Sequence, residues 1–374
     1  MATVLVVGAG FAGAVHAREL AEAGYNVTII DRRCHVGGNA YDYVDSNGVR
    51  VHRYGPHLFH TNNAAVVAWL QRFGRWTAYH HRVRALLSDG RYVPLPVNRT
   101  TIETIYGRHF TSSADVEAFL QTIREPIDNP LNAAEYLYSR IGRLLTDTFF
   151  RPYTRKMWAF DLEDMHASVV KRLPIRLDAE DRYFPDDRFQ LLPSDGYTAV
   201  FERILDHPQI ELALSVEFDR QMEREYEHTF NSMPIDEYFG FCFGELPYRS
   251  IRFHTRSAVE TSAEWSVTNF TDDGPFTRET RWSSLPGHAI RSSGCTTVTA
   301  EEPCDYRDNA MERYYPVRTA DNRFGEVYAR YKASAAGIRG MSFIGRCGTY
   351  QYLDMDQVIN QSLQHIKAWL SGHS

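Results

Sequence analysis

The first forty residues alternate between short apolar runs and a longer stretch with apolar side chains at helical spacing. Val4–Val7 and Val27–Ile30 are rich in β-branched residues and too short for helices, so both are predicted to be β-strands. Between them, Gly13–Ala23 repeats its apolar residues every three or four positions, which predicts an α-helix. The order strand, helix, strand is typical of a βαβ unit with parallel strands.

The same two patterns recur in separate regions further along the chain. Short helices are predicted over Thr101–Asp161, where Ser112 and Ser113 precede a periodic apolar segment as capping residues. Segments of β-type composition that suit an antiparallel sheet are Phe239–Phe253, Trp265–Phe270 and Phe276–Trp282. A last strand and a last helix are predicted over Met341–Ile344 and Asp356–Leu370. Because no repeat or low-complexity linker separates these regions, we expect interwoven domains.

A glycine-rich turn joins the first strand to the first helix. Gly8–Gly13 reads GAGFAG, and this GxGxxG spacing permits a tight turn, close approach of the backbone to a pyrophosphate and close packing of helix on strand. Asp31 ends the second strand, where an acidic residue is expected to hold ribose hydroxyls. The sequence therefore predicts a dinucleotide-binding unit.

A second glycine pair follows the acidic residue, in Arg32–Asn39. Flavoproteins of the glutathione-reductase and amine-oxidase type carry such a pair and NAD-type domains usually do not, so FAD is favoured. The residues expected at this cofactor are Gly8, Gly10, Phe11, Ala12, Gly13, Asp31, Arg32, Gly38 and Asn39.

The composition narrows the class of protein. The chain has 41 Lys and Arg against 47 Asp and Glu, a net charge of −6, which argues against a general nucleic-acid binder. Nearly all of the cations are arginine, which reflects either genomic base composition or sites built from guanidinium groups that suit phosphate. The five cysteines are scattered and form no CxxC motif, so we expect neither a disulfide framework nor a thiolate zinc site. This cysteine usage predicts a protein of the reducing cytoplasm.

The sequence predicts neither a membrane-spanning protein nor a metal-binding one. No apolar run approaches the roughly 20 residues that span a bilayer. His52, His57 and His60 have no carboxylate or cysteine near them at a familiar metal spacing, so we expect no metal site. Taken on their own, His57 and His60 are better interpreted as hydrogen-bonded core histidines.

From Gly37 onward the chain resembles the UDP-galactopyranose mutase family. The resemblance depends on uncommon blocks that occur in the family's order along the whole chain, and it is weakest over Ala258–Met311. The main blocks are GGNAY (Gly37–Tyr41), YGPHLFHT (Tyr54–Thr61), FFRPYTRKMW (Phe149–Trp158), KRLPIR (Lys171–Arg176), DRYFPDDRFQLLPSDGY (Asp181–Tyr197), YYPVR (Tyr314–Arg318) and IGRCGTYQYLDMD (Ile344–Asp356).

The resemblance implies a fold of three interwoven parts in an α/β protein. A Rossmann-like FAD-binding domain is expected over residues 1–77, 193–238 and 312–374. An inserted helical domain carrying a substrate loop is expected over residues 98–175. An antiparallel β-sheet domain is expected over residues 78–97, 176–192 and 239–311. The family resemblance also suggests a homodimer.

The implied activity is an isomerisation that uses FAD in its reduced form without net redox. By analogy with the family, the flavin N5 attacks the anomeric carbon of a nucleotide sugar and expels UDP, giving a covalent flavin–sugar adduct. The sugar ring opens and recloses through another oxygen, and UDP returns. The simplest substrate pair is UDP-galactopyranose and UDP-galactofuranose.

The same resemblance, carried over position by position, assigns roles to residues. Arg172 and Arg278 are expected to hold the diphosphate, and His57 and His60 to lie beside the flavin and the sugar; these four are the catalytic candidates. The other residues expected to contact substrate are Phe149, Phe150, Tyr153, Trp158, Tyr183, Phe184, Asn269, Tyr315, Tyr352, His81 and Arg249. Arg346, Asp354 and Met355, with Tyr352 and His57, are expected to complete the flavin site. Arg249 either lies near the flavin or only braces a strand.

Two departures from the family pattern leave alternatives open. His81 replaces an asparagine expected near the sugar, which allows a different sugar or base with the same mechanism. Met233 replaces a glycine beside the expected flavin domain, which keeps open a non-catalytic nucleotide-sugar-binding protein. An FAD-dependent oxidoreductase is a third possibility, but this function would leave the block FFRPYTRKMW and the arginines Arg172 and Arg278 unexplained.

Overall fold

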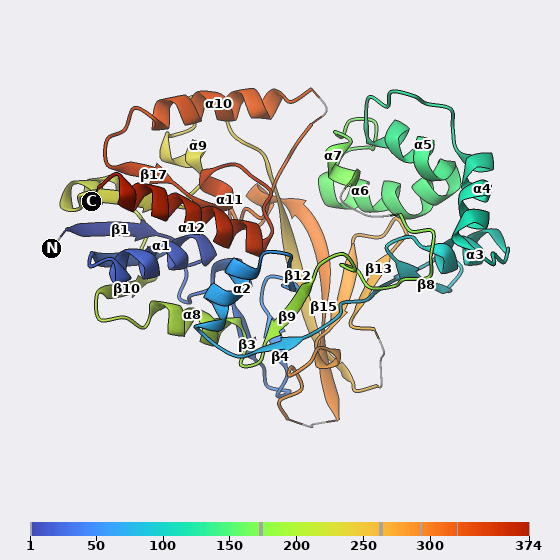
Figure 1. Ribbon diagram of the computed structural model, residues 1–374, viewed down its shortest axis with the longest axis horizontal. Coiled ribbons are helices and arrows are strands. Elements are labelled where there is room, and N and C mark those ends of the chain that lie inside the picture. The colour runs from blue at the N-terminus through green and yellow to red at the C-terminus, as the bar shows by residue number, and fades with distance from the viewer. Residues whose placement is uncertain (1, 172–174, 262–264, 292–293, 320, 374) are drawn as a thin grey trace.

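The computed structural model describes residues 2–171, 175–261, 265–291, 294–319 and 321–373. Within them the strands form two large sheets and two small ones, and the helices gather in two groups, one on each side of the larger sheet (Figure 1). Both termini lie on the same side, in the α/β part.

The α/β part is built on a parallel sheet in the order β10-β2-β1-β11-β17. Its strands are β10 (Ile210–Leu214), β2 (Asn26–Asp31), β1 (Thr3–Val7), β11 (His228–Asn231) and β17 (Met341–Phe343). The accompanying helices are α1 (Phe11–Glu22), α2 (Ala64–Gln71), α8 (Tyr197–Leu205), α9 (Ile235–Tyr238), α10 (Arg323–Ala335), α11 (Gly345–Gly348) and α12 (Met355–Ser371). The predicted βαβ unit is present as β1-α1-β2, and its apolar faces lie in the main hydrophobic core with α8 and α12.

The larger sheet has the order β16-β12-β15-β14-β13-β7-β8. Its strands are β16 (Tyr315–Pro316), β12 (Tyr248–Val259), β15 (Cys295–Asp305), β14 (Arg278–Arg281), β13 (Val267–Phe270), β7 (Val83–Leu86) and β8 (Tyr92–Leu95). It is antiparallel except where β13 runs parallel to β7. The small sheets pair β3 (Asp42–Val44) with β4 (Arg50–His52), and β5 (Phe59–Thr61) and β6 (Trp76–Ala78) with β9 (Phe189–Pro193).

A helical group packs beyond the larger sheet (Figure 1). It comprises α3 (Arg99–Tyr106), α4 (Ser113–Ile123), α5 (Ala133–Leu145), a π-helical turn (Thr146–Phe150), α6 (Arg151–Trp158) and α7 (Ser168–Lys171). Ser112 caps α4 through a reciprocal capping box with Asp115, as its position before the apolar segment predicted. These helices share a hydrophobic core with strands β7 and β8.

These sheets and helices confirm the predicted fold class, a Rossmann-like α/β domain combined with helices and a largely antiparallel sheet. The predicted strand Phe239–Phe253 was wrong in its first half, because β12 begins only at Tyr248. Gly240 and Gly244 adopt positive φ angles of 59° and 98°, which turn the chain instead of extending it. Among the described residues, no helix has the length and apolar character needed to cross a bilayer.

Candidate active site

A cavity of about 850 Å³ lies where the carboxyl ends of the parallel strands meet the larger sheet and helix α6. Parallel α/β sheets bind their ligands at this edge, because the strand ends and helix N-termini converge there. One end of the cavity is lined by the glycine turn after β1, the end of β2 and the start of α12. The other end is lined by α6 and strands β13–β15.

The glycine turn is shaped to accept a phosphate. Helix α1 starts after Gly10 without a side-chain cap, so its first backbone N–H groups are available to an anion. A Cβ at Gly13 would overlap the carbonyl oxygen of Gly8, which shows how closely the helix packs on the strand. A Cβ at Gly38 would lie 2.9 Å from the Cα of Gly10, so the two glycine pairs face each other. This bare backbone fits the pyrophosphate of a dinucleotide.

Asp31 fixes the geometry of this turn. Its carboxylate accepts the Ala9 N–H at 2.7 Å and the Arg33 N–H at 2.8 Å, and the side chain lines the cavity. The Arg33 guanidinium, in turn, pairs with Glu312 and donates to the Asn39 side chain at 3.0 Å. The acidic residue at the end of β2 therefore ties the glycine turn to the second glycine segment.

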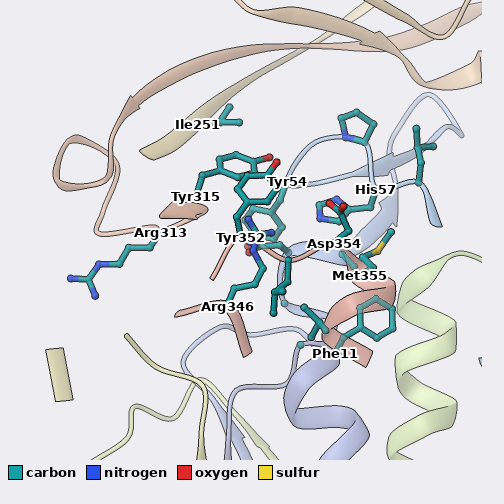
Figure 2. Close-up of a pocket in the computed structure, with 18 of the residues that line it drawn as sticks. Phe11, Tyr54, His57, Ile251, Arg313, Tyr315, Arg346, Tyr352, Asp354 and Met355 are labelled. Atoms are coloured by element: carbon teal, nitrogen blue, oxygen red, sulfur yellow. The ribbon is translucent and has the colours of Figure 1, made fainter. Parts of the chain in front are cut away.

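Aromatic rings and a cation close the middle of the cavity (Figure 2). Tyr315 and Tyr352 stack with ring centroids 5.3 Å apart, and the Arg346 guanidinium lies 5.1 and 5.3 Å from these rings. Asp354 and Met355 approach them from the start of α12. Such flat, polarised walls suit a planar ring system.

His57 faces the same space as a neutral imidazole. Burial lowers its pKa to about 4, with Arg346 and Arg278 adding to the effect. Its Nδ1 lies 2.8 Å from the carbonyl oxygen of Gly55, which can only accept, so Nδ1 carries the proton. The remaining nitrogen, Nε2, therefore acts as a hydrogen-bond acceptor.

His60 and His81 form a second group with Phe184. The His60 ring stacks on Phe184 with centroids 3.6 Å apart, and its Nδ1 lies 2.6 Å from the Asp187 carboxylate. His81 is held at its Nδ1 by the Tyr79 hydroxyl at 3.2 Å. Burial lowers the pKa of His81 to about 3, helped by Arg278 and His60, so this ring is neutral as well.

Arg278 supplies a buried positive charge from the larger sheet. It pairs in register with Glu301 on the neighbouring strand β15, and its Nε lies 2.9 Å from Glu301 Oε1. Burial alone would lower the pKa of Arg278, but Glu301, Tyr153 and Tyr315 together outweigh burial and raise it. The guanidinium therefore stays charged inside the cavity, fixed by a carboxylate that is 1% exposed.

An aromatic wall faces Arg278. Phe149 and Phe150 come from the π-helical turn, and Tyr153 and Trp158 from α6. Trp158 meets Tyr315 edge to face at 6.4 Å. Across from this wall, the Asn269 Oδ1 is buried without a hydrogen-bond partner among the described residues. Aromatic faces, a fixed cation and a free acceptor together suit a nucleotide with a diphosphate.

The cavity brings together nearly all of the residues expected at the site. Those lining it are Gly8, Gly10, Phe11, Ala12, Asp31, Arg32, Gly38, Asn39, His57, His60, His81, Phe149, Phe150, Tyr153, Trp158, Tyr183, Phe184, Asn269, Arg278, Tyr315, Arg346, Tyr352, Asp354 and Met355. Gly13 is not among the lining residues, since it packs helix α1 on the sheet. Arg249 is not either: its Nε donates to the Met157 carbonyl at 2.8 Å, so it braces α6. Arg172 lies outside the described residues.

Other lining residues were not anticipated. Glu301 follows no motif and can be found only through its register with Arg278. Val216–Phe218, after β10, line the cavity beside the end of β2, and no sequence signal marks them. Tyr54 begins the block YGPHLFHT, so it could have been included on that signal. Among the described residues, no group of three or more His, Cys, Asp or Glu side chains could hold a metal ion.

Fold and site together define an enzyme class with a Rossmann-like dinucleotide domain and a second ligand site against a mixed sheet. A model of NAD(P)-binding Rossmann-like domains matches residues 6–73, and the UDP-galactopyranose mutase model matches residues 148–352. The chain belongs to the UDP-galactopyranose mutase family, as its resemblance predicted.

Relatives named as pyranose mutases are similar to this protein over nearly the whole chain. A protein named "Probable UDP-galactopyranose mutase" from Klebsiella pneumoniae is 36% identical, over 99% of this chain and 95% of its own length. A dTDP-fucopyranose mutase from Escherichia coli is 34% identical over 100% of both chains. A crystal structure of reduced UDP-galactopyranose mutase matches in fold with a TM-score of 0.77 at 18% identity, covering 99% of this chain and 94% of that one. The protein is therefore an isomerase, a nucleotide-sugar pyranose mutase, with a flavin-type Rossmann domain.

The buried histidines predict a protein that loses stability in mild acid. Burial is the first cause that lowers the pKa of His16, His52, His57, His81, His228 and His288. Below pH 6.5 the unfolded chain takes up protons that these folded-state imidazoles do not, so the free energy of unfolding falls by roughly 1 kcal/mol per histidine and pH unit. Thermal unfolding followed by circular dichroism should show a Tm roughly 10 °C or more lower at pH 5.5 than at pH 7.

A matched pair of variants checks the origin of this acid effect. His288→Asn removes one buried imidazole and should make the fall in Tm with pH shallower. His109→Asn changes a side chain that is 84% exposed and should leave the slope as it is. A Tm that does not change between pH 7 and pH 5.5 would contradict the prediction.

Proposed function

We propose that the protein interconverts UDP-galactopyranose and UDP-galactofuranose with a bound FAD in its reduced form. The observation that carries the proposal is Arg278, a charged guanidinium fixed by a buried glutamate between the aromatic wall and the dinucleotide end of the cavity. A departing UDP develops negative charge on its diphosphate, and a preorganised cation at that place stabilises it most.

The glycine turn and the open start of α1 would hold the pyrophosphate of FAD, and Tyr315, Tyr352 and Arg346 would flank its ring system. When bound and reduced, the flavin supplies a nucleophilic nitrogen and electrons that are returned within the cycle, so the isomerisation has no net redox.

The chain's own residues would bind, orient and shield the sugar nucleotide. Tyr153 and Trp158 present aromatic faces to the base, and Arg278 holds the diphosphate, with Tyr183, Tyr315 and Tyr352 as hydroxyl partners. By family resemblance, Arg172 adds a second cation.

His57, neutral and protonated at Nδ1, would accept a proton or hydrogen bond at Nε2 from a group beside the flavin. Phe184, stacked on His60 in the cavity wall, would help to keep water away from the reacting carbon. Keeping water out matters because a ring-opened sugar is open to hydrolysis.

Anaerobic conversion tests this function directly. The protein is reduced with dithionite and given UDP-galactofuranose, and the nucleotide sugars are separated by chromatography. The reaction is run toward UDP-galactopyranose because the six-membered ring is favoured at equilibrium. This product should form only with reduced protein, because only the reduced flavin supplies the nucleophilic nitrogen. A flavin-loaded, reduced protein that converts neither UDP-galactofuranose nor dTDP-fucofuranose would contradict the proposal and favour a non-catalytic binding protein.

A second candidate keeps the mechanism and changes the substrate to a dTDP-linked 6-deoxy sugar. Two observations favour it: the match to the dTDP-fucopyranose mutase spans 100% of both chains, and His81, expected near the sugar, lines the cavity. His81 is neutral and its Nδ1 contacts the Tyr79 hydroxyl, so it would offer the sugar a single ring nitrogen, Nε2, rather than the amide of an asparagine.

Exchanging His81 for asparagine should change the preference between the two substrates. The ratio of kcat/KM for UDP-galactopyranose to that for dTDP-fucopyranose is expected to shift about tenfold, the effect of one polar contact. Kinetics with both substrates measure the ratio, and His80→Asn, at an exposed neighbouring histidine, is the control. An unchanged ratio in His81→Asn would exclude His81 from sugar recognition.

We also propose that the protein works in the cytoplasm as a homodimer. The five cysteines are free thiols, which fits a reducing compartment. Light scattering on the purified protein measures the oligomeric state.

A further inference from the structure

Lys156 is a buried lysine on the outer side of the aromatic wall. Its side chain is 8% exposed, although it carries a charge. The ammonium group donates to the carbonyl oxygens of Phe270 and Phe276, each at 2.9 Å, and lies 3.4 Å from the Asp272 carboxylate. All three N–H bonds of the ammonium can therefore be used.

These partners lie in the hairpin between β13 and β14. Phe270 follows Asn269, whose free Oδ1 faces the cavity, and Phe276 precedes Thr277 and Arg278. Beyond the ladder of β13 with β14, the Phe270 N–H donates to the Thr277 carbonyl at 3.0 Å, next to the turn of the hairpin. The Phe270 and Phe276 carbonyls face Lys156 instead. A lysine from α6 thus holds both legs of the hairpin that carries Arg278.

A second cation ties the same helix to the sheet from the other direction. Arg249 of β12 donates its Nε to the Met157 carbonyl at 2.8 Å and approaches the Lys156 carbonyl at 3.4 Å. Cations favour the carbonyl end of a helix, where backbone acceptors have no partner within the helix. Helix α6 is therefore fixed between strand β12 and the β13–β14 hairpin.

We propose that Lys156 is a positioning residue that sets the width of the nucleotide-sugar site, by holding the wall of Tyr153 and Trp158 at a fixed distance from Arg278. The inference rests on the proposed function, because it takes this space to be the site of the base and diphosphate. Lys156 does not line the cavity, so it acts through the elements it joins.

The compact ammonium suits this task. Three converging oxygen acceptors around one point charge match the geometry of lysine, and burial favours the neutral form, which lowers its pKa, while Asp272 opposes this. Methionine has similar length and no donors, so Lys156→Met removes the link and preserves the volume. The two hairpin carbonyls then lose their partner, and the hairpin is free to move away from α6.

The test separates positioning from mere stability. Binding of UDP and of dTDP to the oxidised, flavin-loaded protein is measured by isothermal titration calorimetry, and the tighter ligand is used for comparison. Lys156→Met should raise the Kd about tenfold and KM for the nucleotide sugar in parallel. Its kcat at saturation should fall less than threefold, because bound substrate draws the walls together.

Controls make the outcomes distinct. Arg155→Met removes a neighbouring cation on α6 that pairs with Asp161 and is 54% exposed, and it should bind as wild type does. If Lys156→Met is not recovered folded, Asp272→Asn weakens the same cluster at a 58% exposed residue and should raise the Kd two- to threefold. A folded variant with lower Tm and unchanged Kd overturns the inference. A wild-type protein that binds neither nucleotide overturns the proposed function, and the inference with it.

Discussion

Replacing Arg278 by alanine is expected to lower kcat by about 10³-fold while the flavin stays bound. The guanidinium is the only charged nitrogen group that the described part of strand β14 directs into the cavity, and Glu301 holds it in place. Removing a preorganised group that stabilises developing charge costs about 10²–10³-fold in rate. Loss of the arginine also leaves the Glu301 carboxylate buried without its partner, so the effect is expected at the upper end of this range.

Turnover by the reduced enzyme measures kcat, and the flavin absorbance spectrum of the purified variant measures the amount of bound flavin. Arg281→Ala changes the arginine at the other end of the same strand, outside the cavity, and should keep most of the activity. An Arg278→Ala protein that purifies without flavin would show that Arg278 serves the cofactor instead of the leaving group.

Gly13→Ala is expected to give a protein that is destabilised by about 3 kcal/mol or more and retains little flavin. A single added methyl group would overlap the Gly8 carbonyl and press on Val6, and both atoms belong to the glycine turn and its strand. Overpacking of a tight contact costs about 1–3 kcal/mol, and more where backbone must move. The moving backbone here is the turn proposed to hold the pyrophosphate, so stability and cofactor binding should fail together.

Gly337→Ala is the matched control. Its Cβ would lie 3.4 Å from the Ser334 carbonyl oxygen, close to ordinary contact, and it is exposed after α10. Thermal unfolding and the flavin-to-protein absorbance ratio measure both effects. A Gly13→Ala protein with normal flavin content would show that α1 can shift without opening the turn.

The parts of the fold that could be predicted from sequence are those set by local patterns. The unit β1-α1-β2 follows from short apolar runs around a glycine turn, and helix α1 began only two residues before its predicted start. Strand β15 was missed, although it is 11 residues long and central to the larger sheet. Its residues Cys295–Asp305 mix threonine, glutamate and proline, and six of the eleven are buried in the folded protein, where β12 and β14 pair with the two edges of the strand. Only the tertiary structure supplies that burial.

In the candidate site, too, the sequence predicted what uncommon local blocks encode and missed the contacts made only in the folded protein. The blocks with uncommon sequences placed Tyr153, Trp158 and Tyr315 in one cavity, and they lie there. Sequence could not show that Glu301 fixes Arg278, or that Arg249 braces α6, because these contacts join strands and helices far apart in the chain. The roles of the individual residues stay predictions, as do the domain boundaries at residues 77, 98, 175, 193, 238 and 312.

The order of strands in the parallel sheet has a consequence for how the chain is made. The central strand β1 pairs with β2 at once but finds β11 only after more than 200 residues, and α1 meets α12 through His16 and His365, 349 positions apart. Ribosomes add about 5–20 residues per second, so the N-terminal half of the dinucleotide fold waits tens of seconds for its remaining strands. During this time β1 has an unpaired edge, and contacts of such long range close slowly. Because Asp354 and Met355 at the start of α12 line the cavity, the proposed flavin site is complete only after the chain has been made through the start of this helix.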